Sequence, residues 1–457
     1  MKKVFLGAAA LMCGAIMFGQ TPLPTQVTPN PLAPVGANAA EANQTGNGQL
    51  LKIKQIGYFN SAKTTQGDGT GAGMNEALID QLGGYLTGGV GEGNTGEVRQ
   101  LGTVNEGAIQ QRSYDNNARV DQGQTDHGSS ANKARIEQGD VHGPNETAGT
   151  GNVGYIAQDG IDNSAKTKQT NDNNDAWTDQ DGNHNQAQIR QTSTDAPIAG
   201  GVDEGQTAKV VQHGNTNASW VDQDGHGAGN EAYTTQVGDN NIAVQKQFST
   251  VDWANHGNTA TIEQGPFGHI SNNAYATQDQ EGINQDATIK QYNGDIDSRN
   301  RARQYQRGNA NEADITQTMD NSGHGVNYAN QDQNGVLNDA DLVQDGKNNK
   351  AYQVQHGDRN TVDSEQDGNG NKLNTWQYGN DNYAMTQQNH DNNAALIVQY
   401  DGQSAVLTQS GYENSANIFQ AGPNGGHELL CVFPAFGGHP DYIDPVLEVQ
   451  PVCQNCD

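Results

Sequence analysis

Small, apolar and amide residues recur along most of this chain in one short pattern. In its clearest form the pattern is Q-x-G-x-x-N-x-A-x-x-x-Q, and residues 306–317 hold one complete copy. Glutamines then recur with an unbroken spacing of eleven at positions 333, 344, 355, 366, 377, 388 and 399. A fixed internal period is the signature of a repeat architecture, in which each unit packs only against its neighbours. We therefore assign residues 50–422 to a single repeat domain.

The residues between the Asn and the Gln of each unit alternate in character. Asn258, Ala260, Ile262 and Gln264 share one parity, and Thr or Glu occupies the positions between them. A period of two with polar residues on one side predicts a β-strand. The Gly that follows, often beside Asp, predicts a turn because glycine adopts backbone conformations that other residues avoid. Eleven residues are too few for a strand and a crossover helix, so each unit is predicted to be one strand and one turn.

Two such units make a flattened coil of about 22 residues, and successive coils can stack at the ~4.8 Å spacing of cross-β structure. Stacking places identical positions above one another, so Asn and Gln form ladders in which each amide bonds to the coils above and below. Twenty-nine such glutamines lie between Gln55 and Gln420. The expected fold class is all-β, a β-solenoid of two parallel sheets with about 14 to 15 coils, on the order of 70 Å long.

The amino-acid composition taken alone would indicate a disordered chain, and the repeat changes that interpretation. Of the 457 residues, 32% are hydrophobic and the formal net charge is −29, values typical of disordered chains. Stacked coils remove that conflict because each coil needs little apolar area once the next coil covers it. The charge also argues against nucleic acid as a partner, since 24 Lys and Arg stand against 53 Asp and Glu and nucleic-acid binding requires clustered positive charge.

The two ends of the chain differ from the repeat. Residues 1–19 have the pattern of a secretory signal peptide, with Lys2 and Lys3 before a short apolar stretch. Residues 20–49 contain five prolines and are expected to form a flexible leader. No later segment holds about 18 consecutive apolar residues, so an integral membrane protein is not expected. Residues 423–457 are richer in apolar residues, and three interpretations stay open for them: a cap on the last coil, a segment that docks to a partner, or a disordered tail.

Candidate chemistry is sparse. Cys431, Cys453 and Cys456 favour a structural disulfide because exported proteins meet oxidising conditions, but their pairing stays open. No second pair of Cys or His residues completes a metal site, so no metal or other cofactor is expected. The sequence holds no serine-hydrolase or zinc-peptidase motif, and acidic residues occur in almost every turn, so no catalytic pair stands out. We expect that the protein is not an enzyme.

The repeat signature, after a signal peptide and a polar leader, resembles the curlin repeat of the major and minor subunits of curli fibres. The resemblance covers about 370 of the 457 residues. It implies a β-solenoid that is exported through a dedicated outer-membrane secretion channel, has a nucleator subunit as a partner, and polymerises as a functional amyloid for biofilm matrix and adhesion. Carried over unit by unit, the self-assembly ladder comprises Gln306, Asn311, Gln317, Gln344, Asn349, Gln355, Asn360, Gln366, Asn371, Gln377, Asn382, Gln388, Gln409, Asn414 and Gln420. The corresponding turn glycines are Gly182, Gly308, Gly346, Gly357, Gly368, Gly379 and Gly411.

The predicted fold leads to a functional expectation. A stack of coils has two open ends, and each end presents unpaired backbone groups that can template another copy. Because the contact repeats head to tail, the product is a filament and not a closed ring. We expect an extracellular, cell-surface homopolymer fibre with this chain as its major subunit. The alternative is a capped, non-polymerising β-solenoid that acts as an adhesin or a glycan-binding protein.

Overall fold

The computed structural model describes residues 37–67, 73–83, 93–123, 129–139, 149–193, 205–225, 229–249, 257–265, 271–293, 298–319 and 325–421. Within these residues the chain forms thirty β-strands and no helix. The strands belong to two parallel sheets of fifteen strands each, and the chain passes alternately from one sheet to the other. We call the sheet of odd-numbered strands sheet A and the sheet of even-numbered strands sheet B.

Each strand is short. Sheet A contains β1 (Ala39–Gln44), β3 (Ser61–Gln66), β5 (Thr95–Gln100), β7 (Asn117–Gln122), β9 (Val153–Ile161), β11 (Asp175–Asn183), β13 (Thr207–Asn215), β15 (Glu231–Val237), β17 (Thr259–Gln264), β19 (Asp286–Asn293), β21 (Glu312–Met319), β23 (Asp339–Asp345), β25 (Thr361–Asp367), β27 (Tyr383–Asn389) and β29 (Ser404–Ser410). Sheet B contains β2 (Leu50–Gly57), β4 (Glu76–Gly83), β6 (Glu106–Arg112), β8 (Lys133–Gln138), β10 (Ser164–Thr170), β12 (Gln186–Thr192), β14 (Ala218–Gly225), β16 (Ile242–Ser249), β18 (Tyr275–Ile283), β20 (Ser298–Asn309), β22 (Gly325–Val336), β24 (Lys350–His356), β26 (Lys372–Tyr378), β28 (Ala394–Tyr400) and β30 (Ser415–Ala421).

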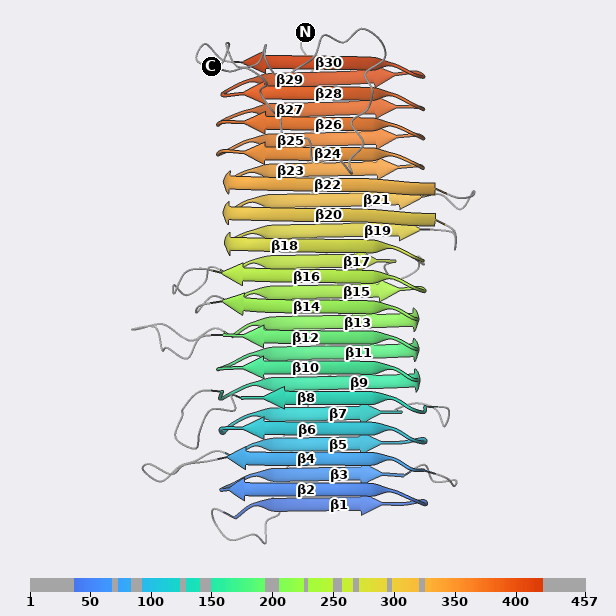
Figure 1. Ribbon diagram of the computed structural model, residues 1–457, viewed down its shortest axis with the longest axis vertical. Coiled ribbons are helices and arrows are strands. Elements are labelled where there is room, and N and C mark those ends of the chain that lie inside the picture. The colour runs from blue at the N-terminus through green and yellow to red at the C-terminus, as the bar shows by residue number, and fades with distance from the viewer. Residues whose placement is uncertain are drawn as a thin grey trace, which may run out of the picture.

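One strand from each sheet makes one coil, and the coils stack along the long axis of the molecule (Figure 1). The register places equivalent repeat positions opposite one another, as Gln344 pairs with Gln366 in sheet A and Gln355 with Gln377 in sheet B. This register continues across the longer gaps between repeats: Gln191 of β12 still pairs with Gln223 of β14. The predicted all-β solenoid with two parallel sheets is therefore confirmed.

The solenoid begins earlier in the chain than predicted. Strand β1 lies within residues 20–49, the segment expected to be a leader, and pairs in register with β3 from Ala39 opposite Ser61 to Gln44 opposite Gln66. The unit escapes recognition because it keeps the amide positions but has Ala42 where most other units have a larger residue, either Ile, Val, Leu or Thr. The predicted signal peptide and the segment 423–457 lie outside the described residues.

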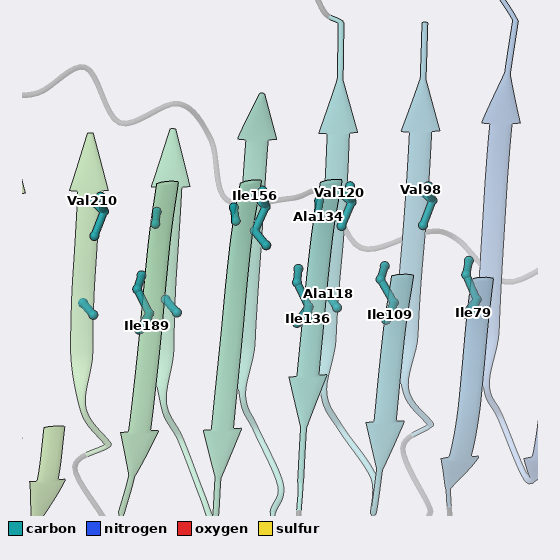
Figure 2. Close-up of a cluster of buried hydrophobic side chains, with 14 of the residues drawn as sticks. Ile79, Val98, Ile109, Ala118, Val120, Ala134, Ile136, Ile156, Ile189 and Val210 are labelled. Carbon is teal, nitrogen blue, oxygen red and sulfur yellow. The ribbon is translucent and has the colours of Figure 1, made fainter. Parts of the chain in front are cut away.

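The core is a set of aliphatic columns between the two sheets. Figure 2 shows Val98, Val120 and Ile156 from sheet A in the space between the sheets. Ile109 and Ile136 enter the same space from sheet B. All five side chains are fully buried, and a second inward position in most strands is a buried Ala. Each coil therefore contributes little apolar area of its own, and neighbouring coils complete its burial.

Some coils carry threonine in an aliphatic column. Thr178 of β11 lies between Ile156 and Val210, and its buried hydroxyl has no hydrogen-bond partner. Thr234 of β15 is the next residue after Val210 in this column, but its hydroxyl donates to Oε1 of Gln245 at 2.8 Å. A buried polar group without a partner costs about 1–3 kcal/mol, so these two threonines differ in their contribution to stability.

The substitution Thr178→Val should stabilise the solenoid by about 1 kcal/mol, because it removes the unpaired hydroxyl and restores the aliphatic column. Thr234→Val is the matched control and should destabilise it, because Oε1 of Gln245 loses its donor. Circular dichroism during thermal unfolding measures both variants. Shifts of the same sign in the two variants would contradict this account of the column.

Candidate self-assembly site

A glutamine near the end of each strand forms a side-chain ladder along each sheet. In sheet A, Nε2 of each glutamine donates to Oε1 of the glutamine one coil nearer the C-terminus, from Gln44 to Gln409. In sheet B the same series runs from Gln55 to Gln420. Every Nε2–Oε1 distance lies between 2.7 and 3.0 Å. Neither ladder has a break.

The second amide hydrogen of these glutamines fixes the direction of the ladder. Nε2 of Gln355 also donates to the backbone carbonyl of Asp339 at 2.8 Å, and Nε2 of Gln377 donates to that of Thr361 at 2.9 Å. Each of these carbonyls belongs to the other sheet. Because a carbonyl only accepts, the NH₂ group must face it, and the side chain cannot turn over. The ladder is therefore polar, with all donors directed toward the C-terminal end.

The asparagines form a second pair of ladders with the opposite direction. The backbone N–H of Asn360 donates to Oδ1 of Asn338 at 3.0 Å, and the N–H of Asn382 donates to Oδ1 of Asn360 at 3.1 Å. The Nδ2 of Asn360 donates to the carbonyl of Gly379 at 2.8 Å, in the turn of the next coil. Each Asn therefore satisfies turn backbone groups that would otherwise be buried without partners.

The turns require glycine for a steric reason. Gly357 has φ of +119°, and a Cβ at this position would lie 2.0 Å from the carbonyl oxygen of Gly379 in the next coil. Gly308 stands in the same relation to Gly335. All of the turn glycines predicted from the sequence have positive φ values, between 81° and 124°: Gly182, Gly308, Gly346, Gly357, Gly368, Gly379 and Gly411.

The structure places the predicted ladder residues in these intramolecular ladders. In the regular run from β21 to β28, Gln317, Gln344, Gln366 and Gln388 follow one another in sheet A. Asn349 and Asn371 belong to the asparagine ladder that leads into sheet B. Only Gln409, Asn414 and Gln420 among the predicted residues belong to the last coil. The cysteines Cys431, Cys453 and Cys456 lie outside the described residues.

A further glutamine ladder, which the repeat pattern did not predict, lies inside the core. At the position where other sheet B strands carry Ile, Val or Thr, five consecutive strands of the sheet, from β16 to β24, carry glutamine, and all five are fully or almost fully buried. Their side chains bond in series at 2.8–3.0 Å. The residues are Gln245, Gln278, Gln304, Gln331 and Gln353. The signal in the sequence is the doublet Q-x-Q, which recurs once per coil over this stretch.

The two ends of the solenoid expose complementary ladder groups. Within the described residues, no donor reaches Oε1 of Gln44 or Gln55 at the N-terminal end. At the C-terminal end, Nε2 of Gln409 donates to the carbonyl of Ala394 and Nε2 of Gln420 donates to that of Ser404, and each retains one hydrogen without a ladder acceptor. One end therefore presents acceptors and the other presents donors for the same ladders.

The outward side of sheet A carries a column of carboxylates. Glu312 lies opposite Asp339, and Asp341 lies between Asp314 and Asp363 in the register of the sheet. We call this group the acidic stripe: Asp286, Glu312, Asp314, Asp339, Asp341 and Asp363. Neighbouring coils partly bury these carboxylates and so reduce their hydration, and adjacent carboxylates repel one another.

These two effects raise the pKa values of several residues in the acidic stripe. Partial burial, followed by repulsion from Asp339 and Asp314, raises the pKa of Asp341 to about 7. Partial burial and neighbouring carboxylates likewise raise the pKa of Asp286 and of Asp339 to about 6. Because the folded state holds these protons more tightly than the unfolded chain does, the stripe opposes folding at neutral pH, and this penalty disappears as the pH falls.

Comparisons with known proteins add no assignment to this geometry. No protein-family model matches the chain, and no curated protein is similar to it in sequence. Across the part of the chain that the structure describes, no helix is long and apolar enough to cross a membrane. The same residues contain no group of three or more His, Cys, Asp or Glu side chains placed to hold a metal ion.

Breaking a glutamine ladder should weaken the solenoid. The substitution Gln317→Ala removes the acceptor of Gln291 and the donor of Gln344, and it should destabilise the fold by about 2–3 kcal/mol because buried amide groups lose their partners. Gln186→Ala removes an exposed glutamine side chain and serves as the control. Thermal unfolding is the measurement, and equal effects of the two substitutions would refute the role of the ladder.

The acidic stripe predicts a pH dependence of stability. The wild-type unfolding temperature should rise as the pH falls from about 8 to about 5, since Asp341 and its neighbours bind protons in the folded state first. Asp341→Asn should stabilise the protein at about pH 8 by on the order of 1 kcal/mol, after allowance for solvent screening, and should reduce the pH dependence. Asp224→Asn is the control, because Asp224 is flanked in its sheet by Thr192 and Phe248. Identical pH profiles for the two variants would contradict the repulsion.

Proposed function

We propose that this chain is a secreted structural subunit that assembles head to tail into fibres. The observation that carries the proposal is the complementarity of the two ends. In both glutamine ladders, the C-terminal coil offers donors and the N-terminal coil offers acceptors. A second copy stacked in the same direction continues these ladders, whereas a copy stacked in the reverse direction places donors against donors.

The backbone supports the same direction of growth. In sheet B the amide of Lys372 donates to the carbonyl of Asn393 at 2.8 Å, and the amide of Ala394 donates to that of Asn414 at 2.7 Å. Ser415 occupies the equivalent position in the last strand, and the described residues provide no acceptor for its N–H. An open strand edge of this kind is a template for another strand. Stacking β2 of the next copy on β30 would supply the missing acceptor.

The core also continues across such a junction. Leu51 and Ile53 at one end and Leu407 and Ile418 at the other are only partly buried and pack at the ends of the core columns. If a second copy continues the register of sheet B, its Ile53 stacks on Ile418 of the first copy. Burial of these side chains provides a hydrophobic driving force, and the ladders provide specificity of register. Repetition by translation and twist yields an open filament.

The finer proposal follows the resemblance to curlin repeats. We propose a curli-like functional amyloid at the cell surface, with this chain as the major subunit, exported through a dedicated channel and started by a nucleator subunit. Biofilm matrix and adhesion are the roles that such a fibre would serve. The cross-β stacking of the coils within one chain supports the amyloid character, because assembly then extends an existing arrangement without refolding.

A charge placed in the end coil tests the proposal. Ile418→Lys should preserve the folded monomer, because residue 418 is partly exposed there, but it should slow fibre elongation by about tenfold or more since growth would bury the ammonium group. Phe419→Lys adds the same charge at the next residue. Because the side chain of Phe419 is exposed and points away from the core, this variant should elongate at nearly the wild-type rate. Thioflavin fluorescence with added seeds and electron microscopy measure elongation.

The possible outcomes separate the two functional candidates. Wild-type fibres with a meridional reflection near 4.8 Å and selective loss of elongation in Ile418→Lys support head-to-tail assembly. Equal elongation of both variants would refute growth through the core of the end coil. Soluble wild-type monomers that persist with β-rich circular dichroism would refute the fibre and favour the monomeric adhesin.

A further inference from the structure

The two outward faces of the solenoid carry opposite charge. Strands of sheet A contain eighteen Asp and Glu but only five Lys and Arg. Strands of sheet B contain fifteen Lys and Arg and nine Asp and Glu. In a protein with a formal net charge of −29, sheet B therefore presents a net positive face. This asymmetry is invisible in the composition and arises from the assignment of alternate strands to opposite sheets.

Four of the fifteen Lys and Arg residues in the sheet B strands line one groove. The groove has a volume of about 730 Å³ and lies over β16, β18, β20 and β22. We call it the basic groove, and the residues that define it are Lys246, Tyr275, Arg299, Arg301, Arg303 and Tyr328. Asp279 is the single acidic residue among the described residues that line it.

The arginines of the basic groove are available for an external partner. Arg307 of the same strand is paired with Glu281, but within the described residues no ion pair holds Arg299, Arg301 or Arg303. All three are exposed. By contrast, Lys133, Arg135 and Lys166 elsewhere on sheet B are already paired with Glu106 or Glu137. Among the described residues Lys52 and Lys168 of sheet B also have no ion pair, but they lie on β2 and β10, far from the three arginines that gather on β20.

The acidic stripe lies on the opposite face of the solenoid and overlaps the basic groove in two coils. The stripe extends over β19, β21, β23 and β25 of sheet A. The groove reaches β20 and β22 of sheet B, which belong to the same coils as β19 and β21. To bring the stripe of one copy against the groove of the next, the neighbouring molecule shifts by about two coils, roughly 10 Å, along the axis. It also shifts along the strand direction, because Asp286 lies beside Gln306, at the other end of β20 from Arg299.

We propose that these two faces form a lateral interface between copies of this chain, with the basic groove on sheet B of one solenoid docked onto the acidic stripe on sheet A of its neighbour. The arginine side chains then neutralise carboxylates that repel one another within a single solenoid. The interface goes beyond head-to-tail growth, since it joins solenoids or fibres side by side. Because it is heterologous, it does not close on itself and it generates sheets or bundles.

The net negative charge does not prevent this contact at physiological ionic strength. The Debye length there is about 8 Å, so the facing patches dominate over charges on distant coils. Lateral association should therefore be strong at low salt and should weaken as salt screens the patches. Head-to-tail stacking depends on hydrogen bonds and apolar burial and should respond much less. The two kinds of assembly can thus be separated experimentally.

The first test neutralises the groove. The triple variant Arg299→Gln, Arg301→Gln, Arg303→Gln should form fibres at the wild-type rate by thioflavin fluorescence but should reduce lateral association about tenfold, seen as single fibres by electron microscopy and as lower light scattering at about 0.05 M NaCl. The control triple Lys133→Gln, Arg135→Gln, Lys166→Gln removes the same number of charges from ion-paired positions. It should bundle like the wild type. Equal bundling of the two triple variants would overturn the proposal.

The second test exchanges the charges. A groove variant with Arg299, Arg301 and Arg303 changed to Glu and a stripe variant with Asp339, Asp341 and Asp363 changed to Lys should each fail to associate laterally. A mixture of the two should associate again, because the acidic groove of one meets the basic stripe of the other. Absence of rescue by two folded variants would overturn the interface.

Both tests remain decisive if the chain forms no fibres. Lateral pairing is then measured on the monomeric solenoids by sedimentation velocity at low salt, with the same variants and the same expected order. Dextran sulfate provides a further comparison. If it binds the wild type and not the groove variants while bundling is unchanged throughout, the basic groove serves an anionic polymer, and the proposal of a second copy is wrong.

Discussion

The structure depends on a hydrogen bond between identical side chains in successive coils. A buried amide normally needs partners at particular positions, and a repeat supplies them automatically because the coil on each side carries the same residue. Gln306 illustrates the arrangement: its Oε1 accepts from Gln280 and its Nε2 donates to Gln333 and to the carbonyl of Asp286. The amide is satisfied without contact with water. This is how a chain with only 32% hydrophobic residues forms a continuous interior.

The ladders also explain how the repeat tolerates insertions. The bond from Gln81 to Gln111 joins residues thirty positions apart, and the bond from Gln366 to Gln388 joins residues twenty-two apart, yet the distances are 2.8 and 2.9 Å. The geometry of the coil is set by the residues that stack and not by the length of chain between them. Extra residues that leave the coil between strands cost little in loop closure, because that cost grows only slowly with length.

The fold was predictable because its determinants are local and repeated. Alternation between Asn258 and Gln264 identifies a strand, and Gly308 or Gly357 identifies a turn, whatever the rest of the chain does. Strand β1 was missed since Ala42 gives too little aliphatic signal, and the inner ladder was missed since Gln245 and its equivalents occupy positions where an apolar residue is expected. Amide and aliphatic side chains can fill the same column when neighbours repeat them, and a pattern search that expects apolar residues does not consider this.

The charge on the two faces could not be predicted in the same way. Whether Arg301 and Asp341 lie on the same face or on opposite faces depends on how many strands separate them, and a single unrecognised unit reverses the answer. The complementarity of the ends likewise depends on the orientation of each amide, which the facing carbonyls fix in three dimensions. These are properties of the assembled stack and not of any one unit.

The inner glutamine ladder has a consequence for how the solenoid comes apart. In a stack where each coil contacts only its neighbours, local unfolding begins at the ends and proceeds coil by coil. Between β16 and β24 the removal of each further coil would also break one buried amide bond of the inner ladder, which joins Gln245 to Gln353 in four steps. Unfolding that advances from either end should therefore slow at these coils. The folded middle of the rod then keeps the register on which the lost coils can reform.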